Sequence, residues 1–369
     1  MRLLVTGAKG FVGKNLVAEL KNRHCDEIYE YEKDTDSKLL DKYCEEADFV
    51  FHLAGVNRPK DQAEFMEGNA GFTSCLLDTL KKYKNTCPVM MSSTIQAELD
   101  NPYGNSKRTG EELLFHYGEE TGIPIYVYRF PNIFGKWCRP NYNSAVATFC
   151  HNISRDLPII VHDPDVVMQL VYIDDVVKEL VNILDNKVNR KGDYCEVPEV
   201  YTITLGEIVN RIKAFRKGRE ECSIPNMMDT FTKKLYSTYL SYLPEDQFSY
   251  TLKMNIDHRG SFTEFIKTPE RGQISVNISK PGIKKGNHWH KTKNEKFLVV
   301  SGKGLIRLRK FNSDIIIEHC VSGDKLEVID IPVGYTHSIE NIGDTDMVTI
   351  IWVNECFNPD NPDTYFLEV

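Results

Sequence analysis

The sequence predicts a doubly wound parallel α/β sheet followed by a smaller all-β barrel. The sheet is predicted by the apolar run Leu3, Leu4 and Val5, which enters a glycine-spaced turn and then an amphipathic helical pattern. The all-β character of the last third is predicted by strands with alternating apolar and polar residues, for example over 304–309. A length of 369 residues favours two domains. A seam after a segment rich in Leu and Tyr divides the chain into domains 1–243 and 244–369.

Composition argues against several classes of partner. The formal net charge is −8 and no basic run stands out, so nucleic acid is not expected as a partner. No stretch has the apolar length of a membrane span, and the opening MRLLVTGAKG enters a strand directly, so we expect a cytoplasmic protein without a membrane partner. The ten cysteines are scattered without a Cys-x-x-Cys pair, which favours reduced thiols over a disulfide framework.

The first turn has the pattern of a dinucleotide site. Gly7, Gly10 and Gly13 lie between the first strand and the helical pattern of Leu16 and Leu20. Glycine allows backbone N–H groups to approach a pyrophosphate at the helix N-terminus, where a Cβ would block the approach. The predicted contacts of this turn are Gly7, Gly10, Phe11, Val12 and Gly13.

The next two strands supply further cofactor contacts. The strand over 27–31 ends in Glu32, Lys33 and Asp34. An acidic residue there would hold the ribose of NAD and a basic one the 2′-phosphate of NADP, so the residues themselves leave the choice open. A strand over 48–55 ends in small residues that suit close passage of a cofactor, and Asn69 precedes an amphipathic helix. The predicted contacts here are Lys33, Leu53, Ala54, Gly55 and Asn69.

Tyr103 and Lys107 are the candidate catalytic pair of this half. Their i, i+4 spacing places them on one face of a helix, after the strand Val89, Met90 and Met91 and its Ser-Ser-Thr end. A phenol beside an ammonium group can have its pKa lowered and can then exchange a proton with a substrate oxygen. A hydroxyl from residues 92–94 would hold the same oxygen.

A metal site is predicted in the last third of the chain. His288 and His290 alternate with Trp289, so on a strand both imidazoles point to one face. Glu295 follows after a turn-like segment, and His337 lies further along the chain. Three imidazoles and one carboxylate suit a borderline divalent metal, zinc first of all.

The last third also resembles the cupin family of small β-barrels. Gly282, His288, His290, Glu295 and Gly302 match its first motif, and Pro332, Gly334, His337 and Asn341 match most of its second. This resemblance implies a metal inside the barrel. It does not imply one reaction, because the same fold hosts enzymes and binding proteins.

Residues 1 to about 240 resemble the extended short-chain dehydrogenase/reductase family, which has a Rossmann-type sheet. Besides the glycine turn and the Tyr103/Lys107 pair, the matching pieces are RFPNIFG over 129–135 and VYIDDV over 171–176. The resemblance implies Tyr103 as general acid, Lys107 as ribose ligand, and Thr94 as the hydroxyl partner, with Ser93 as the alternative. Lys136 and Arg139 are interpreted as solvated, with contact to a diphosphate as the alternative.

The combination of the two domains is similar to a family of bifunctional enzymes of capsular polysaccharide synthesis. That resemblance implies a UDP-linked 2-acetamido-2,6-dideoxy-4-hexulose as substrate. The cupin domain would epimerise C3, and the first domain would reduce the C4 ketone with NADPH, or with NADH, to a UDP-N-acetyl-6-deoxy-L-talose sugar. The ketone acidifies the C3 proton, and a divalent metal, zinc or another, would either stabilise the resulting charge or hold the barrel together.

Some points stay open at this stage. The proton-transferring base of the epimerisation is undecided among His319, Tyr335 and Lys296. One rival hypothesis is a reductase of single activity with a structural or oligomerising cupin, and a second is a dinucleotide-sensing binding protein. We expect a homodimer or a higher homo-oligomer.

Overall fold

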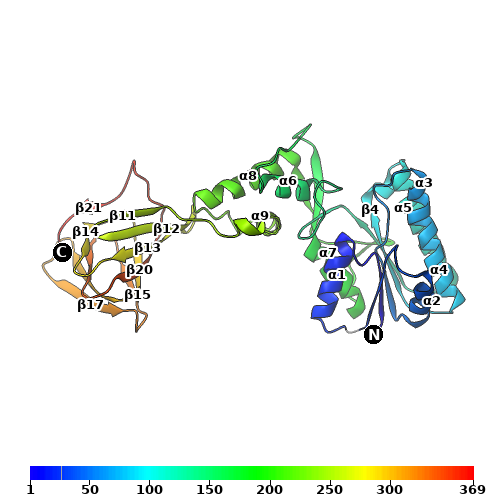
Figure 1. Cartoon of the computed structure of the whole chain (residues 1–369), viewed down its shortest axis with the longest axis horizontal. Coiled ribbons are helices and arrows are strands. Elements are labelled where there is room, and N and C mark those ends of the chain that lie inside the picture. The colour runs from blue at the N-terminus through cyan, green and yellow to red at the C-terminus, as the bar shows by residue number, and fades with distance from the viewer. Residues whose placement is uncertain (26) are drawn as a thin grey trace. The chain divides into compact units, whose positions relative to one another are not determined.

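The computed structural model describes residues 1–25 and 27–369, which form two compact units (Figure 1). The first contains Met1–Lys213 and Thr230–Pro244, and the second Ala214–Asp229 and Glu245–Val369. The sequence-based boundary between 243 and 244 lies one residue from the last of these divisions. It assigns all of 1–243 to the first domain, whereas 214–229 has its contacts with the second unit.

The first unit is built on a seven-stranded sheet in the order β2-β1-β3-β4-β5-β9-β8. All neighbouring strands pair in parallel except β8 and β9 at one edge. One buried hydrophobic cluster packs α1 and α7 on one face, and another packs α2, α4 and α5 on the other, as Figure 1 shows. The predicted doubly wound sheet is therefore confirmed. The strands are β1 (Leu3–Thr6), β2 (Ile28–Tyr31), β3 (Phe49–His52), β4 (Val89–Thr94), β5 (Ile125–Phe130), β8 (Arg190–Lys191) and β9 (Tyr194–Cys195).

Helices follow the strands in the order that the apolar patterns predict. Leu16 and Leu20 of α1 and Leu76, Leu77 and Leu80 of α4 are buried against the sheet, because helical spacing places each set on one face. Asn69 lies inside a π-helical turn, η1, that continues directly into α4, rather than before a separate helix. The helical elements are α1 (Phe11–Asn22), α2 (Ser37–Glu46), α3 (Ala63–Phe65), η1 (Met66–Gly71), α4 (Phe72–Lys82), η2 (Ile95–Glu98), α5 (Pro102–Thr121) and α7 (Ile173–Asn182) with η3 (Ile183–Asp185).

A smaller lobe completes the first unit. Its three-stranded sheet has the order β10-β7-β6, and α6 contacts α9 beside it. Helix α8 begins in the first unit and ends in the second, since the units divide after Lys213. The lobe elements are β6 (Asn132–Phe134), α6 (Ala145–Ile153), β7 (Val167–Tyr172), β10 (Tyr201–Thr204), α8 (Leu205–Glu220) and α9 (Thr230–Leu240).

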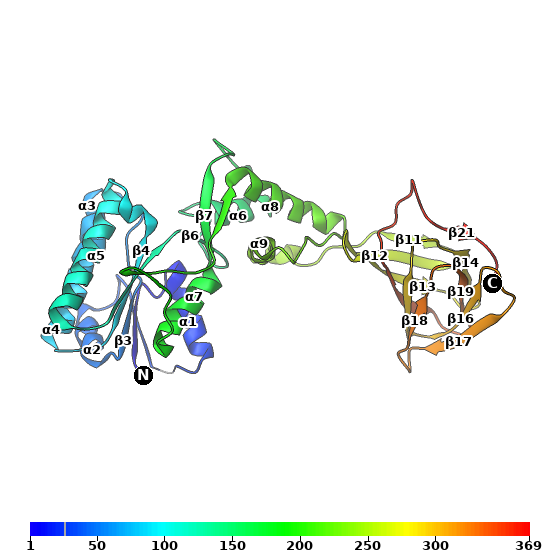
Figure 2. The same cartoon turned by 180° about the vertical axis from the view of Figure 1, so that it is seen from behind.

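The second unit is all-β apart from the end of α8 and the short η4 (Glu245–Gln247) (Figure 2). Six strands form one sheet, in the order β11-β12-β13-β20-β15-β18, and five form another, in the order β17-β16-β19-β14-β21. Phe297, Ile306 and Ile339 belong to the hydrophobic cluster between them. The strands are β11 (Met254–Asp257), β12 (Gly260–Thr268), β13 (Gly272–Ser279), β14 (Lys284–Trp289), β15 (Glu295–Ser301), β16 (Lys303–Lys310), β17 (Ile316–Ser322), β18 (Val328–Ile331), β19 (Tyr335–Asn341), β20 (Met347–Val353) and β21 (Tyr365–Phe366).

Two general features of the chain follow from this architecture. All ten cysteines have free thiols. Within 1–25 and 27–369, each helix is either too short or too polar to cross a membrane.

Candidate active site and metal centre

The glycine turn between β1 and α1 is closely packed. Gly7 has φ +70°, and a Cβ there would lie 2.8 Å from the backbone of Ala54. A Cβ on Gly13 would lie 2.1 Å from the carbonyl oxygen of Gly7. In the described chain α1 has no side-chain cap at Gly10 and no acidic residue in its first turn. No side chain of Gly10 or of the first helical turn therefore caps the first N–H groups of α1, which suits a pyrophosphate.

The other predicted cofactor contacts around this turn include both core and surface residues. The hydrophobic cluster that includes α1 and α7 is also contacted by Phe11, Val12 and Leu53, which therefore support the turn from the side of the core. Lys33 is exposed after β2. Glu32 accepts a hydrogen bond from the backbone N–H of Lys9. The basic and acidic groups that distinguish the two nicotinamide cofactors are thus both present at this strand end.

A buried polar chain connects the cofactor edge to Tyr103. Thr6 Oγ1 lies 2.8 Å from His52 Nδ1, and His52 Nε2 lies 2.9 Å from Thr73 Oγ1, which donates to the carbonyl of Asn69. Burial lowers the pKa of His52 to about 3, so the imidazole is neutral. His52 is not among the site residues predicted from the sequence, where its only signal is a polar residue at the end of an apolar strand.

Asn69 has all its side-chain polar atoms engaged. Its Oδ1 accepts from Val56 N at 2.8 Å, and its Nδ2 donates to Val56 O at 3.0 Å and to Ser106 Oγ at 2.9 Å. Ser106 Oγ donates in turn to the carbonyl oxygen of Tyr103 at 2.8 Å. Asn69 therefore fixes the loop after β3 against the first turn of α5.

Lys107 is buried beneath the same turn. Its Nζ donates to the carbonyl oxygen of Ser92 at 2.7 Å, which ties α5 to the end of β4. Burial lowers the pKa of Lys107 to about 8, partly offset by the charge of Glu111. A Cβ on Gly55 would lie 3.7 Å from Nζ, so the small end of the β3 loop passes directly over the ammonium group.

Tyr103 is half-buried at the start of α5, with its ring 5.5 Å from that of Phe65. Burial raises its pKa, opposite to the shift that a neighbouring ammonium group would cause. A raised pKa keeps the phenol protonated, which is the form a general acid requires. A Cβ on the next residue, Gly104, would lie 2.3 Å from the carbonyl oxygen of Gln96, so only glycine lets α5 begin so close to η2.

The two candidate hydroxyl partners have different environments. Ser93 is buried and donates to Glu111. Thr94 is half-buried, and its Oγ1 accepts from Gln96 N at 3.3 Å, which caps η2. Ser93 is thus committed to the protein interior, which favours Thr94; its role stays a prediction.

Glu111 is the centre of an ion-pair network under the site. It is 1% exposed and receives three hydrogen bonds from Arg129, the shortest 2.6 Å. The guanidinium of Arg129 lies 3.9 Å from the ring centroid of Tyr194. Because Glu111 also holds Ser93, the network joins α5, β4 and β5.

Lys136 and Arg139 both have neighbours on the protein. Lys136 forms an ion pair with Asp174. The Arg139 guanidinium lies 5.0 Å from the ring centroid of Tyr142, which also has Arg58 at 5.8 Å.

The four predicted metal ligands converge in the second unit. One donor atom from each of His288, His290, Glu295 and His337 lies within 4.8 Å of the others. His288 on β14 is in register with His337 on β19, and Glu295 begins β15. Glu295 Oε2 lies 3.0 Å from His337 Nε2 and 3.6 Å from His290 Nε2.

The donor atoms of this cluster fit a metal. His290 Nδ1 lies 2.6 Å from the carbonyl oxygen of Asp363. Because a carbonyl oxygen can only accept, Nδ1 carries the proton, and Nε2 keeps a lone pair that can bind a metal. His290 Nε2 and Glu295 Oε2 are buried, and within 1–25 and 27–369 neither has a well-aligned hydrogen bond; the ion-pair contacts of Glu295 Oε2 are with other members of the cluster. Burial lowers the pKa of His288 to about 4, so this imidazole is a neutral ligand. Buried polar atoms of this kind are stabilised by a coordinated cation.

The three candidate bases differ in their surroundings. Tyr335 packs against the barrel core from β19, the strand that carries His337. Lys296 forms an ion pair with Asp330, and His319 is exposed on β17. This arrangement leaves the assignment of a base open.

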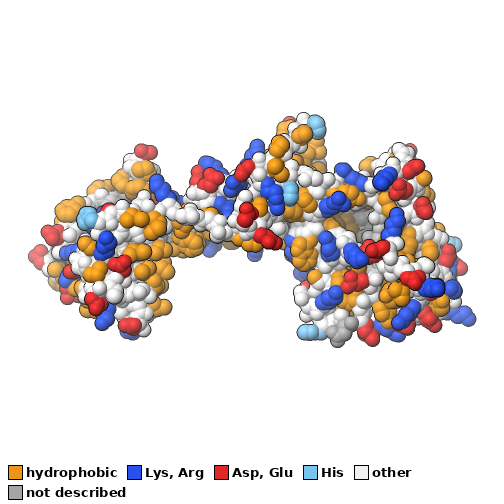
Figure 3. All heavy atoms as spheres, in the orientation of Figure 1, with side chains coloured by type: hydrophobic (Ala, Val, Ile, Leu, Met, Phe, Trp, Pro, Cys, Tyr) orange, Lys and Arg blue, Asp and Glu red, His pale blue; other side chains and the backbone are white. Residues whose placement is uncertain are grey.

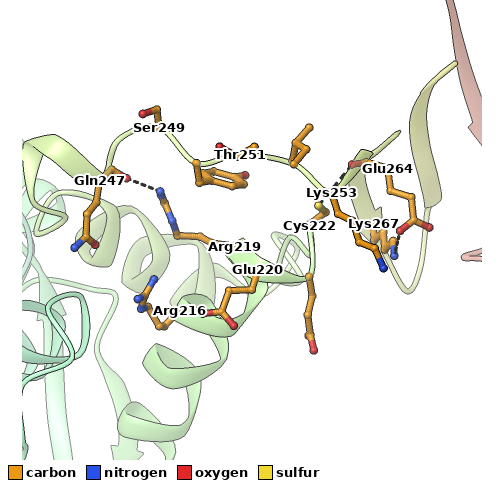
Figure 4. Close-up of a pocket in the computed structure, with 13 residues that line it drawn as sticks. Arg216, Arg219, Glu220, Cys222, Gln247, Ser249, Thr251, Lys253, Glu264 and Lys267 are labelled. Carbon is orange, nitrogen blue, oxygen red and sulfur yellow. Dashed lines mark hydrogen bonds and ion pairs between the residues drawn. The ribbon is translucent and has the colours of Figure 1, made fainter. Parts of the chain in front are cut away.

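A cavity of about 320 Å³ lies elsewhere in the second unit (Figure 4). Arg219 donates to the backbone of Gln247 on one side, and Lys267 pairs with Glu264 on the other. Basic and acidic groups are mixed along its wall, and none of the predicted site residues lines it.

Comparisons with known proteins agree with both halves. Residues 3–203 match the NAD dependent epimerase/dehydratase family, and residues 255–365 match the Polysaccharide biosynthesis C-terminal domain. The chain is 44% identical over 369 residues to the UDP-2-acetamido-2,6-beta-L-arabino-hexul-4-ose reductase of Pseudomonas aeruginosa, covering 100% of this chain and 99% of that protein.

Solved structures give the same result. The capsular polysaccharide assembling protein CapF from Staphylococcus aureus has a TM-score of 0.95 and 57% identity, and all of both chains is covered. UDP-glucuronic acid 4-epimerase from Bacillus cereus, with 22% identity and a TM-score of 0.52, covers 59% of this chain and 83% of its own, and shares the fold. The resemblance predicted from the sequence is confirmed, and a nicotinamide cofactor follows from it. The chain belongs to the NAD dependent epimerase/dehydratase family, in a two-domain form that ends in a Polysaccharide biosynthesis C-terminal domain.

Proposed function

We propose that the chain is a bifunctional enzyme of capsular polysaccharide synthesis. The second unit epimerises C3 of a UDP-2-acetamido-2,6-dideoxy-4-hexulose, and the first reduces the C4 ketone to give UDP-N-acetyl-6-deoxy-L-talose. The reductase activity follows from the full-length match to a hexulose reductase. The observation that carries the two-site proposal is that each unit holds its own cluster of reactive groups, Tyr103 with Lys107 in one and the His/Glu cluster in the other.

The first unit has the groups that the reduction needs. When bound, the reduced nicotinamide supplies the hydride for C4. Tyr103 donates a proton to the ketone oxygen, Thr94 orients that oxygen, and Lys107 holds the cofactor ribose. Lys107 is already fixed by Ser92, and Asn69 fixes the loop that covers it, so the ammonium group is held in place before the cofactor binds. We infer NADPH as the reductant, with Lys33 and Lys9 as the cationic groups for its 2′-phosphate; Lys9 reaches the same strand end, where its Nζ lies 3.6 Å from Asp34.

The second unit has a cluster suited to zinc, held by His288, His290, Glu295 and His337. A zinc ion would act as a Lewis acid for charge that develops when the C3 proton is removed. His290 is oriented by its Nδ1–H bond, which leaves Nε2 facing Glu295. Reduction afterwards removes the ketone that acidifies C3, and the epimerisation then becomes irreversible.

Self-association is part of the proposal. The six-stranded sheet exposes an outer face on which Val276 is in register with Ile350, and Ile278 with Val348, all half-buried in a single chain. Figure 3 shows hydrophobic side chains at the surface of this unit. A second copy packed on this face would cover them as an isologous dimer. Light scattering should give twice the mass of one chain; a monomer at micromolar concentration would contradict it.

The experiment that tests the proposal follows nicotinamide absorbance with purified protein, NADPH and the UDP-4-keto sugar. Absorbance should fall only when the sugar is present, and NMR of the product should show inversion at C3. Reduction without inversion would favour the rival, a reductase of single activity whose cupin is structural. No oxidation of either NADPH or NADH would contradict the substrate assignment.

A further inference from the structure

The C-terminal segment lies along the strand that carries the metal ligands. Strand β21 pairs with β14, so that Phe366 is opposite His288 and Tyr365 is opposite Trp289. Beside this pair, Leu367 N donates to the carbonyl of Asn287 at 3.0 Å. The chain therefore returns from β20 to support His288 through backbone pairing.

Asp363 connects the same segment to the loop that follows His290. Its Oδ1 accepts from Lys291 N at 3.1 Å. Its Oδ2 accepts from Thr292 N at 2.8 Å, from Thr292 Oγ1 at 2.9 Å and from Lys293 N at 3.1 Å. The residue is 8% exposed and has φ +41°, so this contact holds a backbone conformation that L residues seldom adopt.

The backbone of Asp363 completes the connection. Its carbonyl oxygen accepts the Nδ1–H of His290 at 2.6 Å, and a ring held in this way keeps Nε2 as the free donor. Asp363 thus holds the segment 290–293 in two ways: its carbonyl holds the His290 ring, and its carboxylate holds residues 291–293. If the carboxylate were removed, the β21 pairing and the bond from Lys293 Nζ to the carbonyl of Pro362 would remain. The four hydrogen bonds that fix Asp363 itself to residues 291–293 would be lost, and the carbonyl could then move out of line with the imidazole.

We propose that Asp363 is a positioning residue of the metal centre, whose carboxylate fixes the C-terminal segment to residues 291–293 so that its carbonyl orients His290. This inference rests on the metal centre of the proposed function. It adds a residue 73 positions from His290 to that centre. Asp363 is one of two aspartates in the repeated stretch NPDNPD over 358–363, and nothing in that pattern signals such a role.

The test compares zinc affinity and cobalt spectra among four full-length proteins: the native chain, Asp363→Ala, Asp363→Asn and Asp360→Ala. Asp360 is a matched control, because its side chain is exposed in the same segment. Zinc affinity is measured by competition with a chromogenic chelator. Loss of an outer partner of a ligating histidine should weaken binding by about 10- to 100-fold in Asp363→Ala. Asp360→Ala should bind like the native chain.

The cobalt spectrum separates positioning from simple loss of stability. A His290 ring that is free to turn should shift the visible bands of Co²⁺ in folded Asp363→Ala, whereas a structural effect alone would leave them unchanged. If Asp363→Ala does not fold, Asp363→Asn decides, since it keeps the shape and loses the acceptor at one oxygen. If a folded Asp363 variant keeps the native zinc affinity and the native Co²⁺ bands, the role of Asp363 is overturned, while the metal centre stands. A native chain that binds neither metal would overturn the metal centre and the inference with it.

Discussion

The candidate site of the first unit and the His/Glu cluster of the second differ in how fully their polar atoms are hydrogen-bonded without a ligand. In the first unit the polar atoms of Lys107 and Asn69 are satisfied by the protein: Lys107 donates to Ser92, and Asn69 uses both its oxygen and its amide group. In the second unit, His290 Nε2 and Glu295 Oε2 are buried without a well-aligned hydrogen bond from the described chain. The contacts of Glu295 Oε2 with His337 and His290, at 3.0 and 3.6 Å, lie within the cluster itself. We infer from this difference that the first site is pre-organised for an exchangeable cofactor, whereas a resident cation in the second would offset its buried donor atoms.

The largest expected effect separates the two chemistries. Tyr103→Phe should lower the rate of NADPH oxidation by at least about 100-fold, because the general acid is lost while the ring still packs against Phe65. Exchange of the C3 proton with solvent should stay at the native rate. Parallel assays of absorbance and of deuterium uptake check this. Loss of both activities in a folded protein would mean that the sites are not separate.

The next largest effect is expected in the zinc content of the second unit, at its His/Glu cluster. His290→Ala should lose stoichiometric zinc, with an effect larger than the ~10–100-fold expected for an outer partner, because it removes a ligand itself. His319→Ala is the matched control, since His319 is exposed on β17. Metal analysis after dialysis gives the zinc content of both variants. Full zinc in His290→Ala would contradict the ligand assignment.

A third prediction tests the satisfied network below the first site. Glu111→Gln leaves Arg129 without its buried carboxylate, and breaking a buried pair should lower the free energy of unfolding by about 3 kcal/mol. Asp174→Asn breaks the exposed pair with Lys136 and should change it by less than about 1 kcal/mol. Urea unfolding of the two variants measures both values. Equal small changes would show that the Glu111 network contributes little.

The smallest effect is a pH dependence from Lys107, whose pKa burial lowers to about 8. The pKa of an unfolded lysine is about 10.4. Between about pH 8 and that value, the unfolded chain therefore holds a proton on Lys107 that the native chain has released. Its contribution to the free energy of unfolding therefore rises with pH in that window. The ammonium group is lost over the same range, so kcat/KM for the reduction should fall above about pH 8. A profile that stays flat well above that pH would contradict a role for the charged form.

The sequence predicts much of this organisation because several signals are local. The glycine turn, the Tyr103/Lys107 spacing and the His-x-His pair each span only a few consecutive residues, although His290 lies one residue past the end of β14. The structure brings the four predicted metal ligands together. What it did not predict depends on contacts between distant segments. His52 meets Thr6 and Thr73 only through the sheet, and Asp363 meets His290 only after the chain returns along β14. The pKa of Tyr103 also depends on burial, which helical spacing does not reveal.

The measurement that tests the two-site account most directly is deuterium uptake at C3 of the UDP-4-keto sugar in heavy water, without NADPH, by native protein before and after removal of the metal. We predict uptake by the metal-loaded protein, loss of uptake after chelation, and recovery when zinc is restored. Uptake that is independent of the metal, or that requires NADPH, would contradict the assignment of epimerisation to the His/Glu cluster of the second unit.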